Sequence, residues 1–251
     1  MILIRLLKHF GDREIPSFNY EDILGFLSTI TNSNKQSTKK LRYSLLTAFF
    51  NFIRNSNGIQ YQNPCDNPIL RKIFKEPKNP PWAILDKEIV DEMIFRTVNK
   101  RNRLMLELMA RGGMRIGEVL NITSNDIEDR KLIIRDPKSS KETEVVFIPH
   151  KVAHRLKEYI RNKDIQSYDK IFPISYQAAR MAVKKTGNLV GIDLKPHDLR
   201  RHAATFASRS GTPIEIVSKI ILRHTNLSTT QRYLGKVTDI EAMKWIDSLH
   251  G

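Results

Sequence analysis

Residues 197–236 contain most of the side-chain types that chemistry on a phosphate group requires. The segment includes "HDLRRH" and "RHTNLSTTQRY", with His224 nine positions before Tyr233. It carries seven Lys and Arg residues against two acidic ones. Such a local excess of positive charge favours a phosphate-bearing partner. Taken alone, Tyr233 is more typical of a half-buried aromatic residue than of a nucleophile, so its role depends on the rest of the chain.

A second group of residues lies upstream, in "RGGMRIGEVL". Gly112 and Gly113 can end one helix and allow a tight turn, because glycine adopts left-handed backbone conformations easily. Arg115 would then lie near the N-terminus of the next helix, where its guanidinium and the backbone N–H groups could bind an anion. Glu118 lies three residues further on and could orient the arginine. A surface Arg–Glu pair is the alternative interpretation.

The segment "KPHDLRRHAATF" predicts a helix that begins near Pro196. His197 and Arg200 are three residues apart, so they share one face of this helix. Asp198 lies in the first turn, where a negative charge suits the helix dipole. A capping histidine beside a surface arginine would show the same pattern, so this segment gains its meaning from the others.

Cleavage of a phosphodiester without a metal ion requires a defined set of groups. Two cations must hold the non-bridging oxygens, and arginine serves best because its donors form a planar fork. A nucleophile such as a tyrosine oxygen must attack the phosphorus, and an acid must protonate the leaving oxygen. The chain has candidates for every role: Arg115, Arg200, Tyr233, His197, His224, and Lys138 or Lys141.

The N-terminal part of the chain reads as helical. Apolar residues at helical spacing predict helices in 20–30 and 37–55. Basic residues of the second helix lie outside its apolar stripe and face either water or phosphates. The proline-rich segment 56–85 predicts an interdomain linker.

Helical spacing returns from residue 86 and is interrupted once. The short β-branched runs 131–136 and 143–149 predict a hairpin with a lysine-bearing turn. We therefore expect a mainly α fold with a small helical N-terminal domain, 1–78, and a larger, mostly helical domain, 79–251, that carries a short β-hairpin.

Composition narrows the possible partners. The chain has 42 Lys and Arg against 27 Asp and Glu, a net charge of +15, which favours a polyanion. The basic residues are spread along the chain, so nucleic acid is favoured over a membrane surface. The absence of a long apolar run or a signal peptide predicts a cytoplasmic protein. With one cysteine and no zinc-like spacing, we expect no disulfide, metal or cofactor.

The order and spacing of these segments resemble the tyrosine recombinases, also called phage integrases, and "LSTTQRY" is especially similar to Xer-type members. The resemblance rests on "GMRIGEVLNITSNDI", "HDLRRHAATFASRSG" and "ILRHTNLSTTQRYLGKV", and it extends over about residues 86–249. Jointly these three segments are highly specific. The resemblance implies a site-specific DNA recombinase that cleaves and rejoins strands through a 3′-phosphotyrosine intermediate and needs no cofactor.

The resemblance also implies a role for each residue of the catalytic set. Arg115 and Arg200 would hold the scissile phosphate, and Tyr233 would attack it. His224 would hydrogen-bond a non-bridging oxygen, and His197 would act as a base or a positioning group.

The hairpin turn "PKSSKE" matches the part of the family that supplies the general acid. Lys138 fits that role and Lys141 fits a DNA contact, although the two assignments can be exchanged. Glu118 would brace an arginine from behind. Further DNA contacts are expected from Lys39, Lys40, Arg42, Arg201, Arg223, Arg232 and Lys236.

The implied partner is double-stranded DNA. The resemblance implies a helical N-terminal domain that binds core DNA, a homo-tetramer on the DNA and a monomer when free. The apolar residues of 237–249 recur at helical spacing. That segment either packs on its own domain or docks into a neighbouring protomer.

Two features depart from the family pattern. Arg223 stands where the family usually has glycine before the histidine. The N-terminal part shows two clear helices, with 3–10 as a remnant of a third, where the family has four or five, so a truncated domain is one interpretation. Two other functions stay open: a type IB topoisomerase-like nicking and closing enzyme, and an inactive DNA-binding relic of a mobile element.

Overall fold

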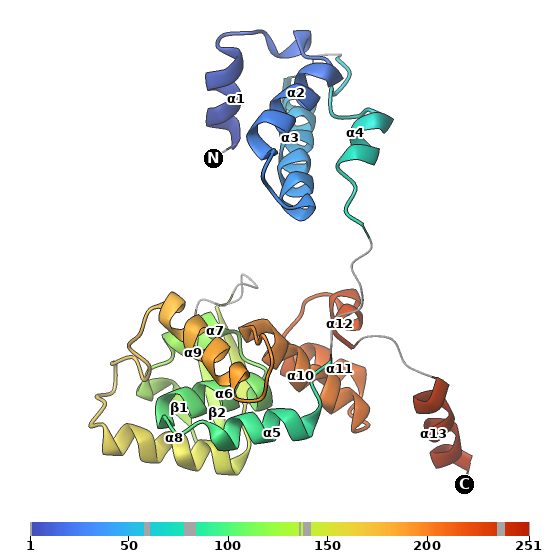
Figure 1. The fold of residues 1–251 in the computed structure, drawn as a ribbon. Helices are drawn as coiled ribbons and strands as arrows, with labels where there is room; N and C mark the ends of the chain where they lie inside the picture. Colours follow the sequence, from blue (N-terminus) through green and yellow to red (C-terminus); the bar gives the residue numbers. More distant parts are fainter. Residues whose placement is uncertain are drawn as a thin grey trace. The chain divides into compact units, whose positions relative to one another are not determined.

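The structure is a computed structural model that describes residues 2–57, 61–77, 84–135, 137, 142–234 and 239–250. The chain divides into two compact units, residues 1–80 and 81–251 (Figure 1). Helices dominate both units, and the larger unit also holds one small sheet. The predicted fold class, mainly α with a short β-hairpin, is confirmed.

The smaller unit packs its helices around one apolar core. Its elements are α1 (Ile2–Phe10), η1 (Ile15–Ser17), α2 (Tyr20–Thr31), α3 (Gln36–Asn57) and α4 (Pro68–Ile73). The start of α2 is fixed by a reciprocal cap, in which the Asn19 side chain accepts from the Asp22 backbone N–H at 2.9 Å and Asp22 accepts from the Asn19 N–H at 3.0 Å. Phe26 and Phe50 are fully buried between α2 and α3.

The sequence predicted an interdomain linker over residues 56–85. This prediction is wrong for residues 61–77, which pack onto the smaller unit and contribute buried side chains to its core. Cys65 and Leu70 are completely buried there. The Asn67 side chain caps α4 by accepting from the Ile69 N–H at 2.8 Å, and Pro68 begins the helix. A helix of six residues is too short for periodicity to reveal it. The smaller unit therefore has four described α-helices, where the sequence indicated two and a remnant.

The larger unit is built around the buried helix α6. Its elements up to the sheet are α5 (Lys87–Arg96), α6 (Lys100–Gly112), α7 (Ile116–Asn121), η2 (Ser124–Asp126), β1 (Ile127–Glu128), β2 (Lys131–Arg135) and β3 (Thr143–Phe147). The later elements are α8 (His150–Asn162), α9 (Tyr176–Asn188), α10 (Pro196–Arg209), α11 (Ile214–Ile216), η3 (Val217–Ile221), α12 (Leu227–Leu234) and α13 (Asp239–His250). The helix α6 packs against α8 and also against α10, which comes much later in the sequence, so it links the earlier and later elements of this unit.

The sheet is antiparallel in the order β1-β2-β3, and its β2–β3 pair is the predicted hairpin. Leu132 faces Val146, and both side chains are buried. The same alternation places Glu144 opposite Ile134, on the inward side, where an apolar residue is normally expected. A buried carboxylate needs a positively charged or hydrogen-bonding partner. For Glu144 this partner is Arg223, which belongs to the candidate site described below.

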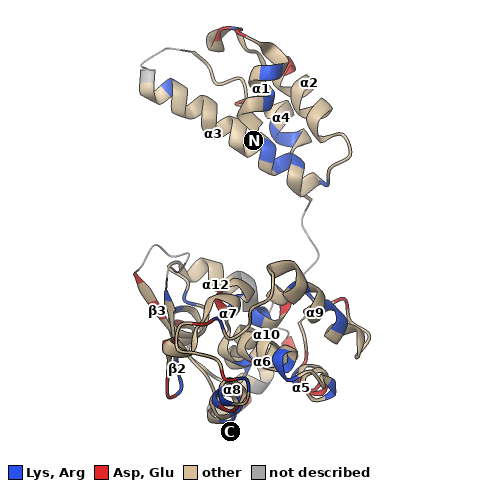
Figure 2. Cartoon of the chain, turned by 90° about the vertical axis from the view of Figure 1, so that its left-hand side faces the viewer, with Lys and Arg blue, Asp and Glu red and all other residues tan. Residues whose placement is uncertain are grey.

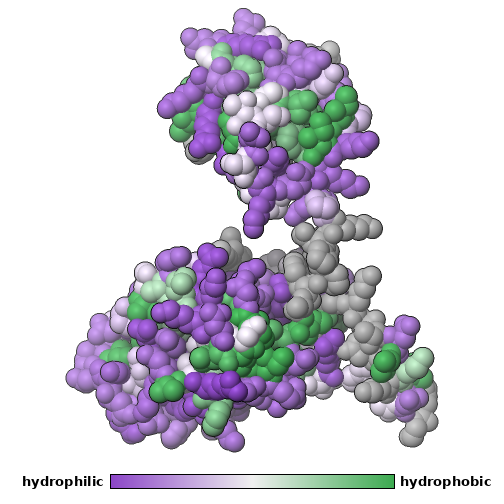
Figure 3. All heavy atoms as spheres, viewed as in Figure 1, coloured by the Kyte–Doolittle hydropathy of each residue, from purple (hydrophilic) through white to green (hydrophobic). Residues whose placement is uncertain are grey.

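Basic residues lie on the helices of both units (Figure 2). Hydrophobic atoms also reach the surface of both (Figure 3). On α13 the exposed apolar side chains are Ile240, Met243, Trp245 and Ile246. In the part of the chain that the structure describes, no helix is both long and apolar enough to span a bilayer.

Candidate active site

Arg115 is positioned by the tight turn between α6 and α7. Gly113 ends α6 with φ +63°, a left-handed conformation that favours glycine. A Cβ at Gly113 would lie 2.8 Å from the Ile221 carbonyl oxygen, so no larger residue fits without movement. The sequence predicted Arg115 near the start of a helix, and Arg115 is the N-cap of α7. The turn is thus pressed against η3, which comes from far later in the sequence.

Glu118 holds Arg115 from within α7. Its Oε1 accepts from Arg115 Nη1 at 2.5 Å, and its Oε2 accepts from the Arg115 backbone N–H at 2.8 Å. Burial alone would raise the pKa of Glu118, but Arg223 and Arg115 outweigh burial and lower it. The carboxylate therefore stays ionised and fixes the guanidinium of Arg115, whose side chain is 29% exposed.

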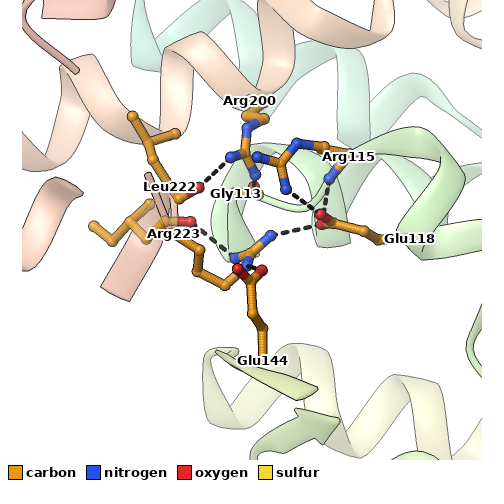
Figure 4. A network of polar contacts seen from close by, with 8 residues as sticks. Gly113, Arg115, Glu118, Glu144, Arg200, Leu222 and Arg223 are labelled. Atoms are coloured by element: carbon orange, nitrogen blue, oxygen red, sulfur yellow. Dashed lines mark hydrogen bonds and ion pairs between the residues drawn. The ribbon is translucent and has the colours of Figure 1, made fainter. Parts of the chain in front are cut away.

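Arg200 is buried, with 1% of its surface exposed. Its guanidinium donates to the carbonyl oxygens of Gly113 and Leu222 (Figure 4). One side chain of α10 thus joins the turn that presents Arg115 to the turn that follows η3. A planar fork with several donors can make such a double contact, whereas a lysine ammonium cannot reproduce its geometry.

Residues 217–224 form an irregular segment that leads to His224. The element η3 is a π-helix, a rare form that is frequent at functional sites. It is followed by Arg223 with φ +51°. A non-glycine residue in this left-handed region costs about 1–2 kcal/mol. The chain accepts that cost at the position next to the candidate histidine.

The side chain of Arg223 turns inward and binds two carboxylates (Figure 4). Its Nη2 donates to Glu118 at 2.5 Å, and its Nε donates to Glu144 at 3.1 Å. Only 3% of the Arg223 side chain is exposed. Glu144, the inward carboxylate of β3, thereby gains its partner. The sequence predicted a DNA contact for Arg223, and its guanidinium lies inside the protein instead.

His224 is held by both its backbone and its ring. Its N–H donates to the Ser218 carbonyl at 2.9 Å, and its Nδ1 lies 3.0 Å from the Thr230 hydroxyl. The Thr230 hydroxyl also lies 2.8 Å from the Ser218 hydroxyl, so His224, Thr230 and Ser218 form one hydrogen-bonded chain. Burial, with Arg200 and Arg115 next in importance, lowers the pKa of His224 to about 4. The ring is therefore neutral near pH 7.

His197 and Arg200 both lie on α10, as "HDLR" predicted, with His197 in the first turn. Desolvation, followed by the charges of Arg201 and Arg200, lowers the pKa of His197. Arg201 is itself buried and pairs with Asp198 at 3.1 Å. A solvent-facing DNA contact by Arg201 therefore has no support in this geometry.

A groove of about 1050 Å³ extends from the two arginines along the larger unit. Besides Arg115, His197 and Arg200, its lining includes basic residues that the sequence did not single out: Arg135, Lys170, Arg180 and Lys195. These residues lie on separate elements, so only the fold brings them together. A single lysine or arginine outside a recognisable motif does not reveal from the sequence that it lines a site.

Several predicted residues lie outside the part that the structure describes. Lys138, Lys141 and Lys236 are among them, as are the side chains of Arg232 and Tyr233. The backbone of Tyr233 belongs to α12, which packs against α10 and η3. Thr230 of the same helix is fully buried and hydrogen-bonded to His224, so it fixes α12 beside that histidine.

The basic residues predicted on α3 have surface positions in the smaller unit. Lys39 and Arg42 are half-buried, and Lys40 is exposed and pairs with Glu76 at 3.7 Å. No group of three or more His, Cys, Asp or Glu side chains is arranged to hold a metal ion within the described ranges.

This fold recurs among solved structures of DNA-rearranging proteins. A XerH site-specific recombinase bound to palindromic difH substrate matches with a TM-score of 0.75 at 19% identity, over 99% of this chain and 77% of that one. The Tn1549 transposon integrase with transposon right end DNA matches with a TM-score of 0.74 at 17% identity, over 99% and 91%. At such low identity the likeness shows the fold alone.

The sequence gives the family directly. The model of the phage integrase family matches residues 85–238. Tyrosine recombinase XerA of Pyrococcus horikoshii is 30% identical over 98% of this chain and 87% of its own length, and XerA of Saccharolobus solfataricus is 26% identical over 94% and 80%. The chain therefore belongs to the phage integrase family, and the predicted likeness to Xer-type tyrosine recombinases is confirmed.

Proposed function

We propose that this chain cleaves and rejoins double-stranded DNA at specific sites and exchanges strands between two such sites. The observation that carries the proposal is that Arg200 joins the turn before Arg115 to the turn before His224, which is itself bonded to the helix that contains Tyr233. Membership of the phage integrase family supports it.

The two arginines would bind the scissile phosphate. Arg115 is partly exposed and held in place by Glu118, so it meets the phosphate without a search over rotamers. Arg200 is buried and adds positive charge in a site with little water, where electrostatic stabilisation of the transition state is strongest. Together they would neutralise the charge that develops on the non-bridging oxygens.

Tyr233 would supply the nucleophile. Its phenolic oxygen forms a bond to phosphorus while the bond from phosphorus to the 5′ oxygen breaks. His197 or water takes the phenolic proton, and a lysine of the hairpin, Lys138 or Lys141, gives a proton to the leaving 5′ oxygen. The product is a 3′-phosphotyrosine and a free 5′ hydroxyl. The reverse reaction with another 5′ hydroxyl completes strand exchange, because the covalent bond keeps the energy of the phosphodiester.

His224 would donate a hydrogen bond to a non-bridging oxygen. In the free protein Nδ1 is hydrogen-bonded to the Thr230 hydroxyl, so the donor to a phosphate oxygen would be the Nε2–H group. A bound phosphate adds negative charge nearby and so raises the histidine pKa, which favours the ring with a proton on both nitrogens. We propose that DNA binding charges His224 and so completes the donor set.

Strand exchange requires more than one protomer. The exposed apolar residues of α13, among them Ile240 and Met243, would dock on a second copy of the chain. We propose a homo-tetramer on DNA, a monomer in its absence, and action in the cytoplasm, where the DNA substrate lies. In the smaller unit, Lys39, Lys40 and Arg42 on α3 would contact phosphates of the same duplex.

Adduct trapping tests this function. The full chain is incubated with duplexes that carry a single nick between randomised arms, so that cleavage near the nick releases a short strand and traps the covalent complex. We expect a protein–DNA adduct that survives denaturation, an enriched sequence in the trapped DNA, and no adduct with Tyr233→Phe. An adduct without sequence enrichment would favour nicking and closing alone. DNA binding with no adduct at all would contradict the proposal and leave an inactive relic.

A further inference from the structure

Position 223 holds an arginine in a backbone conformation that glycine would adopt at lower cost. Arg223 occupies a left-handed conformation, φ +51°, directly before His224. Its guanidinium is nearly inaccessible and bonded at all three nitrogens: to Glu144, to Glu118 and to the Ile221 carbonyl, the last at 2.9 Å. A costly conformation persists when the surrounding contacts over-determine it.

Each contact of Arg223 reaches a different segment of the candidate site. Through Glu118 it shares one carboxylate with Arg115, whose backbone and side chain bind that same group. Through Glu144 it binds β3, the strand that follows the lysine-bearing segment 138–141 in the sequence. Through the Ile221 carbonyl it closes the turn that leads to His224.

The charges support the same interpretation. Arg115, Arg200 and Arg223 with Glu118 and Glu144 leave one net positive charge in the cluster. Without Arg223 the cluster would be neutral, and Glu144 would lose the partner shown in Figure 4. Arg223 therefore balances the two carboxylates that lie beside Arg115 and Arg200, and it does so from inside the protein.

We propose that Arg223 is a positioning residue for DNA cleavage, which locks α7, β3 and the turn before His224 into one arrangement. This inference rests on the proposed roles of Arg115 and Tyr233. It also replaces the direct DNA contact that the sequence suggested for Arg223, since all three nitrogens of its guanidinium are bonded to Glu144, Glu118 and the Ile221 carbonyl.

The test compares Arg223→Met with wild type on a duplex that wild type cleaves. We expect the single-turnover cleavage rate at saturating DNA to fall on the order of 100-fold, because misplacement of catalytic groups by about 1 Å has that effect. DNA affinity and its salt dependence should stay close to wild type. A loss confined to affinity, with a weaker salt dependence, would instead assign Arg223 to a phosphate contact and overturn the proposal.

A second variant separates positioning from loss of folding. Arg223→Met leaves Glu144 buried without its partner, so the double variant Arg223→Met/Glu144→Gln should recover thermal stability while cleavage stays low. Arg223→Lys should recover part of the rate because it keeps the charge. Arg155→Met is the matched control, since it removes an arginine from the buried Glu107 in the same unit, 2.6 Å away, and should lower stability alone.

The controls also separate this inference from the proposed function. If wild type forms an adduct that Tyr233→Phe abolishes, but the double variant at position 223 cleaves at the wild-type rate, only the positioning role is refuted. If wild type forms no adduct, the proposed function itself fails.

Discussion

The two compact units carry positive charge in different ways. In the smaller unit Lys40 on α3 is exposed and Lys39 and Arg42 are half-buried, so water and salt reach these charges and screen them. In the larger unit Arg200 and Arg223 are buried, with 1% and 6% of their surface exposed. Basic residues at a surface can contribute to DNA affinity in many side-chain arrangements. Buried arginines need partners in fixed positions, because their charge is removed from water. We therefore expect substitutions in the two units to affect different steps.

The largest effect is expected from Arg200→Lys. A lysine keeps the charge but cannot hold both the Gly113 and the Leu222 carbonyls in one plane. The cleavage rate at saturating DNA should fall by roughly 100- to 1000-fold, the usual effect of losing a transition-state donor. Single-turnover kinetics measure it, with the exposed Arg161→Lys on α8 as control. A rate close to wild type would contradict the expectation that buried arginines of the larger unit act on the cleavage step.

Glu118→Gln should have the next largest effect. The substitution removes the negative charge that Arg115 and Arg223 share, and loss of one partner from a buried ion pair costs about 3–5 kcal/mol. Chemical denaturation measures the change in the free energy of unfolding, and cleavage should fall with it.

Glu92→Gln is the matched control for Glu118→Gln. Glu92 pairs with Arg96 at the same distance, 2.5 Å, but both side chains are about half exposed. Such surface pairs contribute about 0–1 kcal/mol. Equal losses for the two variants would show that burial does not distinguish the two kinds of pair.

A smaller and different effect is expected from Lys39→Ala/Arg42→Ala in the smaller unit. If both side chains contact phosphates, DNA affinity should fall roughly tenfold and the salt slope should decrease by about one per contact. The cleavage rate at saturating DNA should not change. Titrations at several salt concentrations test this, with Arg161→Ala/Lys163→Ala as a charge-matched control. A reduced rate with unchanged affinity would contradict the division of roles.

The smallest effect concerns pH. The pKa of His224 is lowered from 6.5 to about 4, so between these values the unfolded chain binds a proton that the folded chain does not. The free energy of unfolding should therefore fall as the pH falls from about 6.5 to about 4. In thermal melts, His224→Gln should weaken this dependence, and the exposed His154→Gln should leave it intact. An unchanged dependence in His224→Gln would mean that the ring is not held neutral.

Local patterns predicted those parts of the site that local structure determines. The Gly112–Gly113 turn, the position of Arg115 near the start of a helix and the shared helix of His197 and Arg200 all follow from short spacings. The hairpin was predictable because β-branched runs flank a polar turn. The family resemblance then joined these pieces in the right order.

The remaining features depend on contacts between distant residues. Glu144 is 79 positions from Arg223, and Glu118 is 105 positions away, so no window of sequence connects them. An inward carboxylate on a strand and an arginine in place of a glycine each look like isolated exceptions. They explain each other only when the fold places them together. The short helix α4 was missed for a simpler reason, since six residues give too little periodicity.

The proposed reaction depends on a covalent bond between Tyr233 and DNA. The most direct measurement is peptide mapping of the trapped adduct after nuclease digestion, with mass spectrometry of the peptide that contains "LSTTQRYLGK". We predict a nucleotide attached through its 3′ phosphate to Tyr233 and an unmodified residue in the absence of DNA. A nucleotide on any other side chain, or a 5′ phosphate linkage, would contradict the account.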